Sequence, residues 1–378
     1  AVEPELQVIR SHELQDVQHL QPPAYNIVPT SGLDHDDTDI HFPPESAQNL
    51  TQEHLLTNPD IVDEQEVNTF SCADIIGIPV SECEALVALY NSTNGPNWTN
   101  HTNWLENNQP ATWYAVYTED SGHVRYLDLW ENNLVGTIPA EIGNLTGLYR
   151  LWLNGNVLTG PIPPEIGNMA SLEYLGLYRN QLTGTIPANL GNLNNLHYMW
   201  LEMNNLEGSI PPELGNLTNL ELLNLGDNSL TGEIPSSLGN LLNLRDFFIC
   251  GTQVSGPIPA FVQNLTNLER IWFGGNQFSG AIPAGLGQLE HLHELRLDGN
   301  QFSGTIPGEL GNLSNLTDLW LQDNDLSGTI PTSLGQLSNL QVLYLHGNPL
   351  SGSIPIELNN LTQLRNFYLG NNDMTGTI

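Results

Sequence analysis

A period of 24 residues constrains this chain more than any other feature of its sequence. From Val124 onward the chain divides into ten consecutive blocks of 24 residues without insertion or deletion, and a shorter eleventh block begins at Leu364. The shared pattern is L-x-x-L-x-L-x-x-N-x-L-x-G-x-I-P-x-x-L-G-x-L-x-x, and its first residue is numbered repeat position one. A fixed period of this length predicts a solenoid, in which each coil packs only against its neighbours.

Each part of the pattern has a structural role. The alternating leucines at positions four and six predict a short strand with one buried face, and strands of successive blocks would stack about 4.8 Å apart in a parallel sheet. The asparagine at position nine predicts a turn whose buried amide satisfies backbone groups of adjacent coils. The Ile-Pro pair predicts an extended return segment, because proline prevents a regular helix.

This pattern resembles the plant-type leucine-rich repeat over residues 124–378, about two thirds of the chain. Upstream, the segment Glu82–Tyr90 and the tryptophan-containing stretch 93–116 are similar to the N-terminal cap of such proteins. The resemblance implies an α/β repeat solenoid, a right-handed superhelix with a parallel concave sheet and an extended or 3-10 helical convex side. It divides the chain into an acidic, proline-containing arm (1–70), the cap (71–123), and ten complete repeats with a partial eleventh (124–378).

The cap differs from the family pattern in its cysteines. In the family a cysteine pair flanks a Trp-x-Gly-Val element, but no cysteine lies near Trp113, so we expect packing of Trp98, Trp104 and Trp113 to hold this part together. Cys72 and Cys83 enclose ten residues. They predict a disulfide, with two reduced buried thiols as the alternative. A disulfide together with the resemblance implies a secreted protein, extracellular or at the cell surface.

The charge of the chain excludes several functions. It carries 42 Asp and Glu against 8 Lys and Arg, for a net charge of -34, and all eight bases are arginine. Without lysine there is no P-loop or Schiff-base lysine and no basic tract for nucleic acid or anionic lipid. No apolar run reaches 18 residues, so we expect no membrane insertion. No catalytic or metal-binding motif stands out, so we expect a non-enzymatic protein without metal or cofactor.

Repeat positions three, five and seven are expected to point outward from the concave sheet, and many are aromatic. Trp, Tyr and Arg are enriched in binding hot spots, so this face predicts a binding surface for a protein, peptide or glycan. The alternative is that aromatic residues merely favour strands and stack on neighbouring coils, while the arginines pair with acids of adjacent coils. The predicted ligand-binding residues are Tyr126, Trp130, Trp152, Tyr174, Tyr178, Tyr198, Trp200, Phe248, Trp272, Arg296, Trp320, Tyr344 and Tyr368.

Other hypotheses stay open at this stage. Cys250 lies alone at position seven, where a small residue filling a tight spot is favoured over a reactive thiol. A structural subunit of an extracellular filament or surface layer, joined head to tail through the arm, the cap and the last repeat, is the alternative function. Ice binding is weaker, because it favours rows of small Thr-like residues and the concave rows are bulky and mixed.

Ten N-x-S/T sequons are candidates for glycosylation. In the repeats the asparagine belongs to Asn-Leu-Thr or Asn-Leu-Ser and in most cases is also part of the repeat pattern, so a structural use is enough to explain it. The candidate residues are Asn49, Asn91, Asn97, Asn100, Asn144, Asn216, Asn264, Asn312, Asn315 and Asn360.

Overall fold

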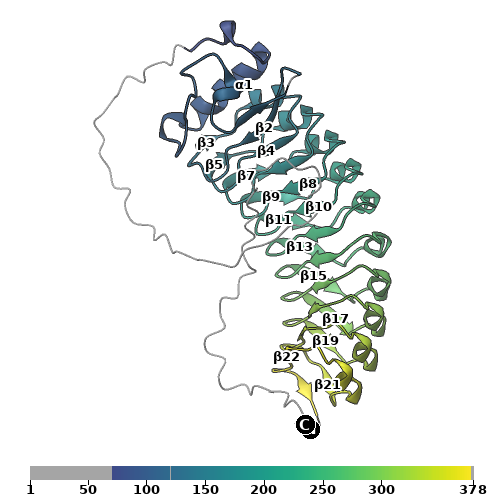
Figure 1. The fold of residues 1–378 in the computed structure, drawn as a ribbon. Coiled ribbons are helices and arrows are strands. Elements are labelled where there is room, and N and C mark those ends of the chain that lie inside the picture. The colour runs from purple at the N-terminus through teal and green to yellow at the C-terminus, as the bar shows by residue number, and fades with distance from the viewer. Residues whose placement is uncertain (1–69, 120, 376–378) are drawn as a thin grey trace, which may run out of the picture. The chain divides into compact units, whose positions relative to one another are not determined.

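The computed structural model describes residues 70–119 and 121–375. Within this part the repeats stack in chain order, with strands on one side of the stack and short 3-10 helices on the other (Figure 1). The predicted arm lies outside the described residues except for Phe70, as do Asn49 and residues 376–378. The filament hypothesis, which depends on the arm and on the last residues, therefore stays a prediction.

A sheet of 12 strands forms the concave side of the described repeats. Its first two strands pair antiparallel and all later neighbours pair parallel, which confirms the predicted parallel sheet. In chain order its strands are β1 (Val116–Thr118), β2 (Val124–Asp128), β4 (Arg150–Trp152), β6 (Tyr174–Gly176), β8 (Tyr198–Trp200), β10 (Leu222–Asn224), β12 (Asp246–Phe248), β14 (Arg270–Trp272), β16 (Glu294–Arg296), β18 (Asp318–Trp320), β20 (Val342–Tyr344) and β22 (Asn366–Tyr368).

The return segments form a second parallel sheet of nine strands, followed by a separate pair. The nine strands are β3 (Val135–Thr137), β5 (Val157–Gly160), β7 (Gln181–Thr185), β9 (Asn205–Ser209), β11 (Ser229–Gly232), β13 (Gln253–Gly256), β15 (Gln277–Gly280), β17 (Gln301–Thr305) and β19 (Asp325–Ser327), and the pair is β21 (Ser351–Gly352) with β23 (Asp373–Met374). One 3-10 helix then closes each of ten coils: η4 (Ala140–Asn144), η5 (Pro164–Asn168), η6 (Ala188–Asn192), η7 (Pro212–Asn216), η8 (Ser236–Asn240), η9 (Ala260–Asn264), η10 (Ala284–Gln288), η11 (Gly308–Asn312), η12 (Thr332–Gln336) and η13 (Ile356–Asn360).

The core lies between the two sheets and the 3-10 helices, and it consists of the apolar positions of the repeat. In the repeat that begins at Leu196, each of these side chains is at most 1% exposed. They are Leu196, Met199, Leu201, Leu206, Ile210, Leu214 and Leu217. Because a single coil has no second layer to cover these side chains, the stack of coils is the folding unit.

The cap packs as its tryptophans predict. It contains η1 (Cys72–Asp74), α1 (Val80–Ser92), η2 (Gly95–Asn97) and η3 (Pro110–Thr112). The ring centroids of Trp98 and Trp104 lie 4.9 Å apart, and those of Trp104 and Trp113 lie 5.2 Å apart. All three rings are at most 4% exposed, so these contacts take the place of the missing cysteine pair.

Two further links fix the cap. The predicted disulfide between Cys72 and Cys83 is present, with a Cα–Cα distance of 5.8 Å, and it joins η1 to α1. Glu82 of α1 is 1% exposed, and its Oε2 accepts a hydrogen bond of 2.8 Å from the backbone N–H of Val124. Its Oε1 lies 2.6 Å from Nδ1 of His123. The helix of the cap is thus attached directly to the first strand of the repeats.

The asparagine ladder at position nine has the geometry that the sequence predicts. Nδ2 of Asn204 donates to the carbonyl oxygens of Leu177 and Leu201, each at 3.1 Å, so it joins the preceding coil to its own. Oδ1 of Asn204 accepts from the N–H of Leu182 at 3.0 Å. Thr252 replaces asparagine in one repeat, where its hydroxyl bonds Oδ1 of Asn276 and the carbonyl of Ile249.

The second sheet presents rows of small polar residues to solvent. Its outward positions are ten, twelve and fourteen, as the exposed Gln181, Thr183 and Thr185 of β7 show. Position twelve is Thr or Ser in nine of the eleven blocks. The strand register places position fourteen of one coil opposite position twelve of the next, as for Thr305 and Ser327. This regular array of hydroxyl groups is separate from the concave face.

The sequons of the repeats lie on the opposite side of the coils from the concave sheet. Five of them end 3-10 helices with an exposed asparagine, and Asn315 follows shortly after one. The five are Asn144, Asn216, Asn264, Asn312 and Asn360. Their exposure is compatible with glycosylation, which stays a prediction.

We predict that Asn204→Leu lowers the free energy of unfolding by about 3 kcal/mol. It leaves the buried N–H of Leu182 without a partner, and it removes one of the two amide hydrogen bonds to each of the carbonyls of Leu177 and Leu201. Denaturant unfolding followed by circular dichroism measures the change. The neighbouring, exposed Asn205→Ser is the control and should change stability by less than about 0.5 kcal/mol. Equal effects of the two substitutions would show that the ladder contributes nothing specific.

Candidate functional site

The large sheet converts repeat positions into columns of side chains. Each strand pairs with the next in constant register, so that Trp152 lies opposite Gly176, and Gly176 lies opposite Trp200. Position four points inward, as for the fully buried Leu151, and positions three and five point to the concave face. Residues 24 apart in the sequence are therefore neighbours on this face.

The rings at position five are far less exposed than the sequence predicts. Trp152, Trp200, Phe248 and Trp272 are between 3% and 8% exposed, so the expectation that they face solvent is wrong for these four. Neighbouring coils cover them, because a ring of this size reaches the next column member about 4.8 Å away. The ring centroids of Phe248 and Trp272, for example, lie 4.5 Å apart.

Gly176 explains how the first two tryptophans are buried. It offers no side chain between Trp152 and Trp200, whose rings approach across it to 6.4 Å in an edge-to-face arrangement. A Cβ at Gly176 would lie 3.3 Å from Cδ1 of Trp152, so the space is already filled. The position-five rings farther along, Trp320, Tyr344 and Tyr368, are only half-buried and contact one another at 4.8 Å.

A column of tyrosines crosses the first strands of the sheet, and we call it the tyrosine column. It consists of Tyr117, Tyr126, Tyr149, Tyr174 and Tyr198. Successive ring centroids lie 6.4, 5.6, 5.2 and 5.0 Å apart. Tyr117 is 54% exposed and the other four are half-buried, so the column presents accessible ring surface.

Two members of this column, Tyr117 and Tyr149, are not among the binding residues that the sequence pattern predicts. Tyr149 occupies position two, which was not counted among the outward positions, and Tyr117 belongs to the cap strand β1. Tyr149 fills the column because position three of its repeat is Arg150. Tyrosines at positions two and three of successive repeats were a signal for this column. Counting position two among the outward positions would have identified Tyr149 from the sequence.

Neighbouring charges keep the tyrosine column in place. The guanidinium of Arg125 lies 4.4 Å from the ring of Tyr149, and that of Arg150 lies 4.9 Å from the ring of Tyr126. Burial, followed by hydrogen bonding to Tyr174 and Glu173, raises the pKa of Tyr149. Its phenol therefore stays a neutral hydrogen-bond donor at physiological pH.

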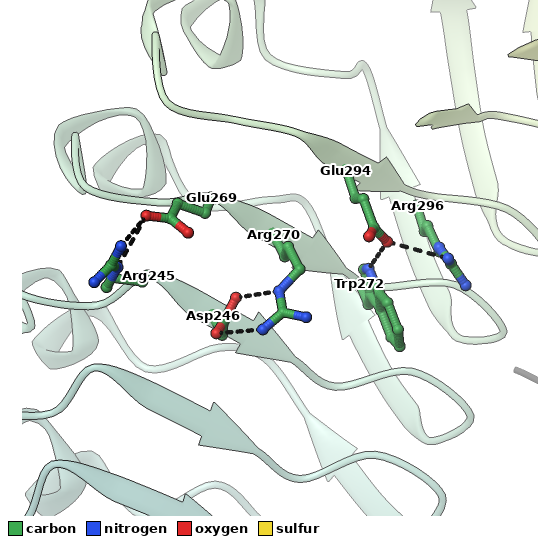
Figure 2. A network of polar contacts seen from close by, with 7 residues as sticks. All are labelled: Arg245, Asp246, Glu269, Arg270, Trp272, Glu294 and Arg296. Atoms are coloured by element: carbon green, nitrogen blue, oxygen red, sulfur yellow. Dashed lines mark hydrogen bonds and ion pairs between the residues drawn. The ribbon is translucent and has the colours of Figure 1, made fainter. Parts of the chain in front are cut away.

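The arginines of the central coils are paired with acids of adjacent coils, as the alternative hypothesis expects. Figure 2 shows Arg270 held by both carboxylate oxygens of Asp246, at 2.6 and 2.7 Å. In the same view Arg245 pairs with Glu269 of the next coil, with an Nε–Oε1 distance of 2.9 Å. The positive charges of these outward-facing arginines are thus largely neutralised by carboxylates of the same sheet.

Arg296, a predicted binding residue, is also held within the sheet. Its guanidinium lies between the rings of Trp272 and Trp320, at 4.1 and 4.4 Å from their centroids. Glu294 accepts hydrogen bonds from Nη2 of Arg296 at 3.1 Å and from Nε1 of Trp272 at 3.0 Å (Figure 2). This arrangement gives Arg296, Trp272 and Trp320 a mutual packing role.

Position seven forms a second column with a different character. Its predicted aromatic members, Trp130 and Tyr178, are half-buried, and burial raises the pKa of Tyr178 to about 12. Cys250 is packed over Gly226, where a Cβ would lie 3.0 Å from its Sγ. Burial and then Asp227 raise the pKa of this thiol to about 12, so it stays protonated and fits the interpretation of a small residue in a tight place.

Glu202 is the most unusual member of that column. It is 9% exposed, and its Oε2 has no hydrogen-bond partner among the described residues. Burial raises its pKa to about 8.

No group of three or more His, Cys, Asp or Glu in residues 70–119 and 121–375 is placed to hold a metal ion. In the same residues no helix is long and apolar enough to cross a membrane.

Two family models match the repeats. A leucine-rich repeat region matches residues 180–302, and a leucine-rich repeat matches residues 123–145, 147–169, 315–337 and 339–361. Together they cover more than half of the chain. The fold and its repeat define a leucine-rich repeat solenoid, and the chain belongs to the leucine-rich repeat proteins. A search of curated proteins found no match.

Solved structures of plant proteins share this fold. The ectodomain of the Arabidopsis thaliana receptor kinase GASSHO1/SCHENGEN3, in complex with CASPARIAN STRIP INTEGRITY FACTOR 2, is 38% identical with a TM-score of 0.74, over 79% of this chain and 36% of that one. The Arabidopsis receptor kinase HAESA, in complex with the peptide hormone IDA and the co-receptor SERK1, is 31% identical with a TM-score of 0.66, over 78% and 54%. A plant ice-binding protein is 28% identical with a TM-score of 0.66, over 79% and 96%. This chain thus spans about a third to a half of the receptor structures.

We predict that Glu202 makes stability fall as the pH rises. Its pKa is raised in the folded state, so the folded protein binds more protons than the unfolded chain between its ordinary pKa of 4.5 and about 8, and stability decreases through this window. Glu202→Gln should match the wild type near pH 4 and exceed its stability by at least about 1 kcal/mol at pH 9. Denaturant unfolding at both pH values measures the difference.

The exposed Glu207→Gln provides the control for charge removal, since it lies in the next strand on the other sheet. It should leave the pH dependence of unfolding unchanged. A Glu202→Gln protein with the same pH dependence as the wild type would contradict the assignment of a destabilising buried carboxylate.

Proposed function

We propose that this chain is a non-enzymatic scaffold that binds a protein or peptide partner on its concave face, with a glycan as the alternative ligand. The observation that carries the proposal is the tyrosine column: five rings in contact, accessible to solvent, on one continuous surface across neighbouring strands. It replaces the buried rings at position five as the main contact surface. Trp320, Tyr344 and Tyr368 form a second, smaller aromatic group on the same face.

The physical argument concerns rigid apolar area. Rings that are already stacked lose little conformational freedom when a partner covers them, so more of the burial energy contributes to affinity. The phenol groups add polar contacts of defined direction. Tyr198, for example, donates a hydrogen bond of 3.0 Å to Glu221, which fixes its hydroxyl at the rim of the column.

The structural relatives support this proposal. Two of them are receptor ectodomains in complexes with a peptide hormone or an integrity factor. Their extracellular location and the disulfide of the cap favour an extracellular or secreted protein here as well. Since this chain spans only 36% and 54% of those two structures, its partner and location remain part of the proposal.

We predict that Tyr174→Ala combined with Tyr198→Ala weakens partner binding at least tenfold, because it removes the two rings of the column that lie closest together, 5.0 Å apart. Peptides selected against the whole chain from a random twelve-residue phage library would serve as ligands, and isothermal titration calorimetry would measure their Kd. Phe261→Ala is the matched control, since Phe261 lies in η9 on the side away from the concave sheet.

Binding by the control should stay within about twofold of the wild type. Failure to enrich any peptide, or peptides whose Kd the tyrosine substitutions leave unchanged, would contradict the proposal. Circular dichroism of both variants establishes that each is folded before binding is compared.

A second candidate is ice binding at the second sheet, and the hydroxyl array favours it. The bulky rings argue against ice binding at the concave face, but this argument does not apply to the second sheet. The second sheet instead carries rows of Thr and Ser, whose hydroxyls are oriented by bonds to glycine carbonyls, as from Thr159 to Gly136 at 3.1 Å. Ice presents a regular lattice of hydrogen-bonding sites, and strands repeating every 4.8 Å or so offer a regular array to match it. The similarity to a plant ice-binding protein, 96% of which is covered, supports this candidate.

If this candidate holds, the chain should inhibit ice recrystallisation, and Thr231→Tyr should remove most of that activity. Thr231 is exposed in β11, and a tyrosine there would hold the array away from a flat crystal surface. Splat-cooled wafers and thermal hysteresis measure the effect. Thr332→Tyr, at an exposed position of η12, is the control and should retain activity. A wild-type chain without activity would exclude the candidate.

A further inference from the structure

The columns at positions seven and eight form an acidic strip along the central coils, with Arg179 and Arg296 as neighbouring positive charges. In the six coils from residue 196 to residue 339 these positions include four acids and no arginine. The acids are Glu202, Asp227, Asp298 and Asp323. By contrast, Asp246 and Glu269 at positions three and two are paired with arginines of adjacent coils.

The four acids form two pairs of like charge. Burial is the main cause of the raised pKa of Glu202; the positive charge of Arg179 opposes the shift, and the negative charge of Asp227 one coil away adds to it. Asp298 repeats this arrangement: burial raises its pKa to about 6, Arg296 opposes the shift, and Asp323 one coil away adds to it. Two carboxylates held together in this way are stabilised by a cation placed between them.

Between the two pairs the columns carry almost no side chains. Glycine occupies five of the six positions there, and the sixth is Cys250. The glycines are Gly226, Gly251, Gly274, Gly275 and Gly299. A Cβ at Gly274 would lie 2.6 Å from Oδ1 of Asp298, so the carboxylate of Asp298 leans over this glycine. The backbone of a ligand can approach closely where side chains are missing.

Among the unpartnered buried polar atoms of the position-seven column, two lie at the ends of this region. Oε2 of Glu202 and Oε1 of Gln322 are buried and have no hydrogen-bond partner among the described residues. Glu202 is 9% and Gln322 8% exposed. A buried acceptor without a donor is costly, and both atoms require donors that the described residues do not provide.

We propose that the two acidic pairs, Glu202 with Asp227 and Asp298 with Asp323, bind two cationic side chains of one extended peptide segment that runs along the stack. This rests on the proposed function of the concave face and names the charge of the partner. Each pair offers two carboxylates, fewer oxygen ligands than Ca²⁺ takes, whereas a guanidinium can bond carboxylates through several donors at once. Arginine is therefore the preferred partner residue.

The spacing of the pairs sets the spacing of the cations. The pairs are four coils apart, which corresponds to roughly 19 Å at about 4.8 Å per coil. An extended chain covers about 3.3 Å per residue, so two arginines about six residues apart would reach both pairs. The glycines between the pairs leave room for the backbone that connects them.

The test uses the whole chain and a synthetic peptide of glycine and serine, acetylated and amidated, with two arginines six residues apart. Two comparison peptides carry neutral citrulline in place of both arginines, or arginines only two residues apart. Isothermal titration calorimetry at low salt gives Kd for each peptide. We expect the peptide with the six-residue spacing to bind at least tenfold more tightly than either comparison peptide.

The protein variants separate a specific site from general attraction to an acidic chain. Glu202→Gln with Asp298→Asn should weaken binding of the diarginine peptide at least tenfold. Glu207→Gln with Asp325→Asn removes the same charge from exposed positions of the second sheet and should change Kd less than twofold. Equal losses in the two double variants, or equal binding of the arginine and citrulline peptides, would overturn the proposal.

The proposed function can survive that failure, because its own test uses different residues. If library-selected peptides lose affinity with Tyr174→Ala and Tyr198→Ala but not with Glu202→Gln and Asp298→Asn, the concave face binds a partner without the acidic pairs. If neither set of substitutions affects them, both proposals fail.

Discussion

The asparagine ladder is the interaction on which the rest of the structure depends. Where a coil leaves the large sheet, the carbonyl at position six and the N–H at position eleven lose their sheet partners, and the amide of position nine supplies both kinds of bond. Asn204 and Asn228 make the same bonds to their respective neighbours. Because the coils are attached to one another in the same way, except where Thr252 replaces the asparagine, the register is passed along the stack without drift.

A constant register has consequences for charge and for ring packing. It brings residues 24 apart in the sequence into contact, so Arg270 meets Asp246 and Arg245 meets Glu269. In these pairs, the few arginines of an acidic chain form ion pairs with carboxylates of the sheet itself. The surface left for a partner differs between columns: it has accessible tyrosine rings near the cap and a strip of acids at positions seven and eight.

The sequence predicted much of the fold, because the fold follows from a repeated local pattern. The parallel sheet, the ladder, the disulfide of Cys72 with Cys83 and the tryptophan packing of the cap are all confirmed. The candidate site was predicted less well. Position five faces outward as expected, but Trp152 and Trp200 are buried, because Gly176 between them allows their rings to meet.

By itself the sequence determined the period, the stacking and which positions face outward, because these depend only on the spacing of apolar residues and asparagine within one repeat. Only the tertiary structure decided which outward residues are accessible and which charges are compensated. The exposure of a ring such as Trp272 depends on Phe248 and Arg296 in the adjoining coils, and the environment of Glu202 depends on Asp227. Such contacts involve side chains a full repeat apart, and the pattern of a single repeat does not contain them.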